Sequence, residues 1–286
     1  MLQPLLRFIF LLAMTVWLIG CASDSENVAM RPTMSHGKKQ PRRYLNIPHE
    51  TAYSPAFSFP KGARSIDDAL YAFAPGALDQ LKPYFRQAGV AYPPREIVLI
   101  AYKDERKMEL WARSDSEKFK LIRPYNIKAA SGMRGPKLRQ GDRQVPEGIY
   151  HIAHLNPNSN YHLSMKVDYP NEFDLDHAMY DGRHDLGGDI FIHGKNVSAG
   201  CLAMGDAAIE ELFVLAAHVG ANNIKVVIAP SDPRLRPLDT SHPSLPVWTP
   251  ELYDRITREI FAITGGKPPI KLAHSTASHP LYRPAN

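Results

Sequence analysis

The stretch IFIHGKNVSAGCLAMGD, residues 190–206, joins a predicted strand to a predicted helix through a short loop. Branched and aromatic residues predict a strand over 189–193. Apolar residues recur at helical spacing over 206–219, and Gly220 follows them as a helix stop. The connection between the two elements is short enough to fold back on the strand.

Cys201 and His193 lie on the two sides of that connection, eight positions apart (201 − 193 = 8). A cysteine becomes a strong nucleophile when a nearby histidine removes its proton or a helix N-terminus lowers its pKa. Both features are present, since Gly194 permits a sharp turn and a predicted helix follows Cys201. We therefore predict a thiolate-like Cys201, with a pKa well below the ordinary value of about 8.5. Gly200 has no Cβ, so a substrate carbonyl could approach backbone N–H groups beside the sulfur.

Seven runs rich in branched and aromatic residues predict a β-rich domain, and their succession favours an antiparallel sheet. These runs are 97–103, 108–114, 119–127, 148–155, 162–169, 189–193 and 224–230. Helical spacing predicts two short helices within 65–88, separated at Pro75-Gly76, and one more helix at 250–264. The spacer 135–148 has three glycines and two prolines, so we expect a loop whose charged residues line a cleft.

Ile192-His193-Gly194 followed by Ser198-Ala199-Gly200-Cys201 resembles the core motif of the L,D-transpeptidase catalytic-domain family, also called the YkuD family. The resemblance extends to GPKLRQGDRQVPEGIY (135–150) and covers about 96–230, somewhat under half of the chain. Two positions depart from the usual pattern, because Val145 stands in place of threonine and Ala199 in place of histidine. The short histidine-to-cysteine spacing and the sequence Cys-Leu-Ala-Met are similar to the YafK-like branch.

The resemblance implies a mostly β, sandwich-like or barrel-like catalytic domain with a few flanking helices. It also implies a cysteine enzyme that attacks an amide of peptidoglycan next to meso-diaminopimelate and forms an acyl-enzyme thioester. Carried over residue by residue, Cys201 is the nucleophile and His193 the general base and later acid. The Gly194 carbonyl orients the imidazole, and the N–H groups of Gly200 and Cys201 form the oxyanion hole. We expect Ser198 to bond within its own loop.

The residues leave three functions open. If an amine takes the acyl group, the protein is an acyltransferase that makes cross-links or attaches protein to peptidoglycan. If water takes it, the protein is a hydrolase that cuts a peptide bond of the wall or a protein-to-peptidoglycan bond. The third hypothesis is a non-catalytic binding module of the cell envelope.

Three basic side chains are candidates for binding substrate carboxylates: Arg183, Arg134 and Lys137. His177 and His184 precede His193 among several aspartates, but no HExxH helix or paired-cysteine pattern accompanies them. We therefore predict neither a metal site nor a cofactor.

The N-terminus predicts export and lipidation. Residues 1–20 contain one early cation and then an apolar run of about a dozen residues, typical of a signal peptide and short for a membrane span. Leu18-Ile19-Gly20-Cys21 resembles the lipobox of bacterial lipoproteins, which implies a lipid on Cys21; ordinary secretion with a chance cysteine is the alternative. No aspartate follows Cys21, so we expect a lipoprotein on the periplasmic face of the envelope, at the outer membrane. Lipidation would leave Cys201 without a disulfide partner, because the chain has two cysteines.

The 286 residues divide into a signal peptide (1–20), a flexible tether (21–62), a helical N-terminal extension (63–95), a catalytic domain (96–230) and a proline-rich C-terminal extension with one helix (231–286). The net charge of +5 is weakly basic, and the basic residues are scattered without stacking aromatics, which argues against nucleic acid. The expected partners are peptidoglycan, the membrane through the lipid on Cys21, and a wall-linked protein as acceptor or substrate.

Overall fold

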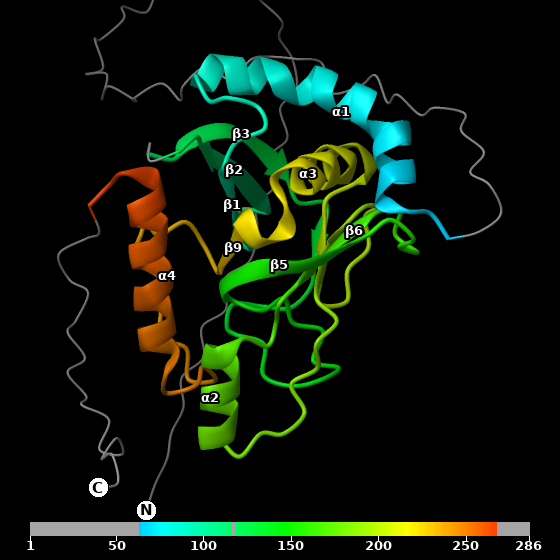
Figure 1. The fold of residues 1–286 in the computed structure, drawn as a ribbon. Coiled ribbons are helices and arrows are strands. Elements are labelled where there is room, and N and C mark those ends of the chain that lie inside the picture. The colour runs from blue at the N-terminus through cyan, green and yellow to red at the C-terminus, as the bar shows by residue number, and fades with distance from the viewer. Residues whose placement is uncertain (1–62, 116–117, 268–286) are drawn as a thin grey trace, which may run out of the picture. The chain divides into compact units, whose positions relative to one another are not determined.

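A computed structural model describes residues 63–115 and 118–267 of the protein (Figure 1). The predicted signal peptide, the lipidated Cys21 and the tether lie outside these residues, as does the chain from 268 onwards. The strands are β1 (Glu96–Tyr102), β2 (Lys107–Arg113), β3 (Lys120–Asn126), β4 (Ala129–Ala130), β5 (Gly148–Asn156), β6 (Ser164–Val167), β7 (Phe191–His193), β8 (Leu202–Ala203) and β9 (Ile224–Ala229). Within the described part of the chain they form one sheet in the order β3-β2-β1-β9-β5-β6-β7-β8-β4.

The mostly β fold with a few flanking helices is confirmed, and all seven predicted strands are present within two residues of the expected bounds. The prediction missed β4 and β8 because each has two residues, which is too short for any periodic pattern. It was also wrong about direction in two places, since β1 runs parallel to β9 and β7 runs parallel to β8. The burial of β1 and β9 is nearly continuous rather than alternating, as expected for strands covered on both faces.

A single helix, α1 (Ile66–Ala88), replaces the two short helices predicted within 65–88. Pro75 and Pro83 lie inside it, although proline removes a helical hydrogen bond and bends the helix. The buried face nevertheless continues on both sides of Pro75, with Phe73 before it and Leu81 after it, and the helix packs on α3 (Asp206–Val219) and β3. Burial of this long face outweighs the local cost of proline, and Figure 1 shows α1 bending along its length.

The described chain contains a short helix that the pattern did not predict, α2 (Glu172–Tyr180). Its apolar residues do not gather on one face, which explains why periodicity failed to indicate it. A capping box between Asn171 and Asp174 marks its start and is the signal that could have found it. The helix predicted over 206–219 is α3, with the same bounds, and a short 3-10 helix (Ala221–Asn223) leads from it to β9.

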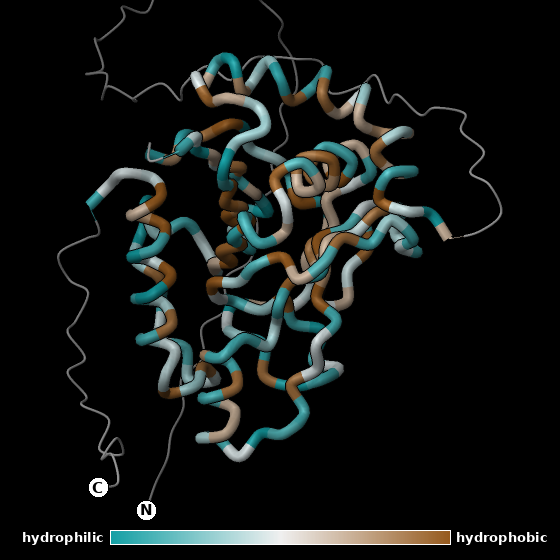
Figure 2. Tube along the Cα trace, viewed as in Figure 1, coloured by the Kyte–Doolittle hydropathy of each residue, from teal (hydrophilic) through white to brown (hydrophobic). Residues whose placement is uncertain are grey.

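The helix predicted over 250–264 is α4 (Thr249–Thr264), and it covers the face of the sheet opposite α1 and α3 (Figure 1). α4 is therefore a packed layer of the fold. Figure 2 shows hydrophobic residues gathered on the central strands and on α3. The cluster beneath α4 consists of Val98, Ile100, Tyr102, Trp111, Val227, Ala229, Trp248, Leu252, Tyr253, Ile256, Ile260 and Ile263. In residues 63–115 and 118–267, every helix is too short or too polar to span a bilayer.

Candidate active site

The parallel pair β7 and β8 brings His193 and Cys201 to one place. His193 is paired with Ala203, and Cys201 precedes β8 at the level of Phe191. Residues level with one another in paired strands point to the same face, so His193 and Cys201 share a face, two positions apart on neighbouring strands. A rise of about 3.3 Å per residue and a strand spacing of about 4.8 Å put their Cα atoms roughly 8 Å apart. Two inward-pointing side chains can span that separation.

The imidazole of His193 is held by its neighbours in one orientation. His193 is 2% exposed, and its Nδ1 lies 2.6 Å from the Gly194 carbonyl oxygen. Because a carbonyl can only accept, Nδ1 carries the proton and Nε2 has the free lone pair that a general base needs. The predicted hydrogen bond to Gly194 is thus present. The ring of Tyr161 lies 4.6 Å from the imidazole, tilted by 37°, so this half-exposed tyrosine flanks His193.

Gly194 is needed because its surroundings leave no room for a side chain. A Cβ at this position would lie 2.7 Å from the Tyr161 carbonyl oxygen and 2.7 Å from Asp206 Oδ1. Asp206 Oδ1 accepts the Lys195 N–H at 2.8 Å, which ties the turn after β7 to the start of α3. The close approach of three segments at Gly194 fixes the carbonyl that orients His193.

The surroundings of Cys201 do not favour the predicted thiolate. Burial raises the pKa of Cys201, and the favourable N–H of Phe191 does not compensate. Sγ lies 3.6 Å from the Asp189 carbonyl oxygen, a contact that suits a protonated sulfur. Burial also lowers the pKa of His193, against the opposing effect of its bond to Gly194. The prediction was wrong because it left out burial, which is the largest influence on the pKa of this thiol.

The two N–H groups predicted to form an oxyanion hole already have partners. The Gly200 N–H donates to Ser131 Oγ at 2.6 Å, and the Cys201 N–H donates to Ser198 Oγ at 3.2 Å. Ser198 Oγ in turn donates to the Cys201 carbonyl at 2.7 Å, as expected for a serine that bonds within its own loop. The oxyanion role of these N–H groups stays a prediction, and it requires the hydroxyls to move aside. Ser131 was missed, because nothing in its local pattern marks it.

The sequence also matches a known family. The sequence model of the L,D-transpeptidase catalytic domain, YkuD, matches residues 96–228, which run from the start of β1 into β9. By this match, residues 96–228 resemble an L,D-transpeptidase catalytic domain.

The domain is also similar to individual proteins. It is 37% identical over 119 residues to the YafK protein of Escherichia coli strain K12, a match that covers 41% of this chain and 46% of YafK. The chain thus spans about half the length of the curated relatives it matches. Among solved structures, it is similar to Pgp2, a helical cell shape determining protein from Campylobacter jejuni, with a TM-score of 0.40, 18% identity, and 54% and 56% of the two chains covered. Bd1075 of Bdellovibrio bacteriovorus gives a TM-score of 0.35 at 22% identity, with 48% and 49% covered.

Of the three basic residues predicted to bind substrate, Lys137 is the one whose charge acts on Cys201. Burial raises the pKa of Cys201, and the Lys137 ammonium partly opposes this rise. Lys137 is itself 6% exposed and donates to Asp142 and to the Arg139 carbonyl at 2.7 Å. It therefore has an internal partner, and a substrate carboxylate would have to share it with Asp142.

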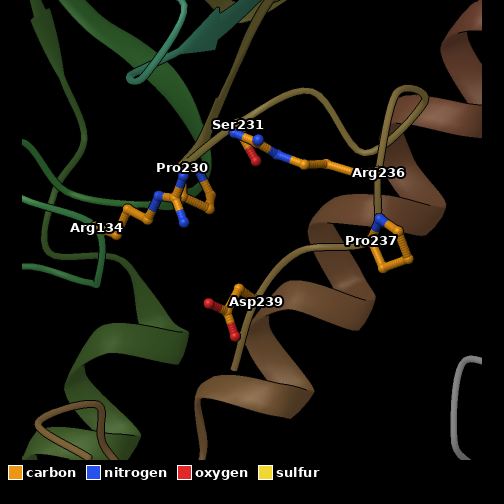
Figure 3. Close-up of a pocket in the computed structure, with 6 residues that line it drawn as sticks. All are labelled: Arg134, Pro230, Ser231, Arg236, Pro237 and Asp239. Atoms are coloured by element: carbon orange, nitrogen blue, oxygen red, sulfur yellow. The ribbon is translucent and has the colours of Figure 1, made fainter. Parts of the chain in front are cut away.

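The other two basic residues have structural partners. Arg183 donates to the Leu138 carbonyl and to Asp181, both at 2.9 Å. Arg134 donates to Asp104 at 2.7 Å. It lines a cavity of about 240 Å³ beyond the end of β9, where Figure 3 shows Arg134 and Arg236 reaching towards each other past Pro230 and Ser231. The residues that line this cavity are Arg134, Pro230, Ser231, Arg236, Pro237 and Asp239. They include neither Cys201 nor His193.

Proposed function

We propose that this protein is a cysteine-dependent enzyme that modifies peptidoglycan through an acyl-enzyme thioester at a stem peptide containing meso-diaminopimelate. One observation carries the proposal: within an L,D-transpeptidase catalytic domain, the parallel pairing of β7 and β8 places Cys201 and His193 on one face. The hydrogen bond from His193 Nδ1 to Gly194 supports the role of Nε2 as the base.

The first half of the reaction is proton transfer coupled to attack. His193 Nε2 takes the thiol proton while Cys201 Sγ bonds to the carbonyl carbon of the amide, and negative charge develops on the carbonyl oxygen. A neutral thiol beside a neutral imidazole suits this coupled step, because burial raises the pKa of Cys201 and lowers that of His193. The oxyanion would take over the N–H of Gly200 from Ser131 and the N–H of Cys201 from Ser198.

The second half distinguishes transfer from hydrolysis. When the C–N bond breaks, the leaving amine takes the proton from Nε2 of His193, and a thioester remains on Cys201. An amine or a water then attacks the thioester carbon, gives its proton to Nε2, and the thiol recovers that proton as it leaves. We propose acyl transfer to an amine of peptidoglycan or of a wall-linked protein, with hydrolysis by the same residues as the second outcome of the test.

We also propose that the protein works at the periplasmic face of the envelope, attached to the outer membrane by a lipid on Cys21. The lipobox-like Leu18-Ile19-Gly20-Cys21 supports this location. Globomycin-type inhibition of lipoprotein processing should leave an uncleaved precursor, and Cys21→Ala should abolish metabolic labelling with a fatty acid. Fatty-acid labelling that persists in Cys21→Ala would show that the lipid is not on Cys21 and would overturn this proposal.

The enzymatic proposal is tested with the full-length lipoprotein, purified in detergent and incubated with peptidoglycan sacculi. Mass spectrometry of the released muropeptides should show new amide cross-links or newly attached amines for transfer, and shortened stems or released wall-linked protein for hydrolysis. Cys201→Ser keeps the size of the side chain and should lose at least about 10³-fold in rate, because serine lacks an equally acidic nucleophile. Gly188→Ala, a substitution in the same region with ordinary contacts, is the matched control. A Cys201→Ala protein that forms the same products would show that the sulfur is not the nucleophile.

A further inference from the structure

A buried hydrogen-bonded network joins the residue that follows β1, the chain before β5, and α4. Lys103 Nζ donates to Glu147 Oε1 at 2.9 Å, to the Val145 carbonyl at 3.0 Å and to the Gly135 carbonyl at 3.3 Å. Glu147 is completely buried and also accepts the Gly135 N–H at 2.8 Å and the Tyr253 hydroxyl at 2.8 Å. All three ammonium hydrogens of Lys103 and both carboxylate oxygens of Glu147 therefore have partners, which is the condition for a stable buried ion pair.

This network fastens the segment that flanks the nucleophile. We call residues 131–147 the flanking segment. Near its start, Ser131 Oγ accepts the N–H of Gly200, and the Ser131 carbonyl accepts the Val145 N–H at 3.3 Å. The segment also carries Lys137, whose charge acts on Cys201. A displacement of this segment would change both the backbone partner and the charge beside the sulfur.

Tyr253 is the contribution of α4 to this arrangement. The helix lies outside residues 96–228, which match the L,D-transpeptidase catalytic domain. We propose that Tyr253 is a positioning residue: its hydroxyl, through Glu147, holds the flanking segment in place beside Cys201. The C-terminal layer of the fold would then be part of the catalytic machinery. The inference rests on the proposed function only in treating Cys201 as the nucleophile.

The alternative is that Tyr253 only fills space beneath α4. Its ring belongs to the hydrophobic cluster that joins α4 to β1 and β9, and phenylalanine would preserve that packing. The chain offers a matched control in Tyr102, which belongs to the same cluster and whose hydroxyl donates to Glu109 at 3.4 Å, away from the flanking segment. Tyr253→Phe and Tyr102→Phe thus remove the same atom from the same cluster.

The experiment compares the full-length wild type, Tyr253→Phe and Tyr102→Phe by hydrogen exchange and by alkylation of Cys201. In Tyr253→Phe, amides of residues 135–147 should exchange about tenfold faster, the effect of one lost hydrogen bond to a buried charge. Amides of β1 and β9 should exchange at the same rates as in Tyr102→Phe. The midpoint of the pH profile for alkylation should rise by about half a pH unit in Tyr253→Phe alone, because Lys137 would lie farther from the sulfur.

Each outcome bears on the inference separately from the proposed reaction, because neither measurement uses peptidoglycan. Selective loosening of 135–147 with a shifted alkylation midpoint supports a positioning role, even if the wild type fails to act on sacculi. Exchange that accelerates equally across the fold, or identical behaviour of the two variants, overturns it and leaves Tyr253 as a packing residue. If sacculi are modified, a loss in kcat for Tyr253→Phe with KM unchanged supports the role, and unchanged kcat opposes it.

Discussion

Replacement of Gly194 by alanine tests whether the close approach at the end of β7 sets up the base. The new Cβ would lie 2.7 Å from both the Tyr161 carbonyl oxygen and Asp206 Oδ1, and 3.1 Å from His162 Cβ. Ordinary contacts begin at about 3.4 Å, so the backbone must shift by about 0.7 Å. Overpacking of this kind costs about 1–3 kcal/mol. For a domain of this size, the melting temperature should fall by about 4–8 °C at the middle of that range.

The same shift should reduce activity more than stability. The Gly194 carbonyl holds His193 Nδ1 at 2.6 Å, so a moved carbonyl turns the imidazole. A misplacement approaching 1 Å can cost about 10²-fold in rate. Thermal unfolding and turnover of sacculi should be measured for Gly194→Ala beside Gly188→Ala, whose Cβ would lie 3.8 Å from the Tyr169 carbonyl oxygen. If Gly194→Ala melts and turns over like Gly188→Ala, the argument from crowding is refuted.

Three further predictions concern buried ionisable side chains. Alkylation of Cys201 should have a midpoint above about 8.5, because burial raises the pKa of its thiol; a midpoint near 7 would contradict a neutral resting thiol. Burial raises the pKa of Asp174 to about 7, so the folded state binds this proton more tightly than the unfolded state does. Its contribution to stability is therefore present near pH 4 and lost as the pH rises through about 7. In the wild type, the free energy of unfolding in urea should therefore fall between pH 4.5 and 7.5, and Asp174→Asn should reduce this fall by at most about 4 kcal/mol. If the variant shows the same pH dependence as the wild type, Asp174 is not its source. Arg123→Met should cost about 3–5 kcal/mol because it leaves Glu211 buried without its partner at 2.7 Å, whereas Arg113→Met, at a half-exposed pair, should cost less than about 1 kcal/mol.

Local sequence patterns were sufficient to predict most strands of the sheet and the helix α3. Runs such as 97–103 and 224–230 are long, apolar and bounded by turns, so periodicity and propensity agree there with the fold. The pair of Cys201 and His193 could also be singled out, because a short loop between a strand and a helix restricts where the two side chains can go. Fold class and candidate nucleophile were thus predictable from residues close together in sequence.

Features that depend on distant contacts could not be predicted in this way. The continuity of α1 through Pro75 depends on packing against α3, and the parallel pairing of β1 with β9 joins segments more than a hundred residues apart. The pKa of Cys201 depends on how deeply the fold buries it, which no local motif encodes. Ser131 reaches Gly200 from 69 positions away. Each of these features depends on segments that are far apart in the sequence and meet only in the fold.

The occupied N–H groups and the raised thiol pKa have one common consequence for the site at rest. The N–H groups of Gly200 and Cys201 donate to the hydroxyls of Ser131 and Ser198. At rest, these two N–H groups are therefore not available to stabilise a negative charge beside the sulfur. A neutral thiol is also oxidised more slowly than a thiolate. This matters in the proposed exported location, where a lipid on Cys21 would leave Cys201 without a cysteine partner. The site would then become reactive only when a bound carbonyl displaces the serine hydroxyls and His193 receives the proton.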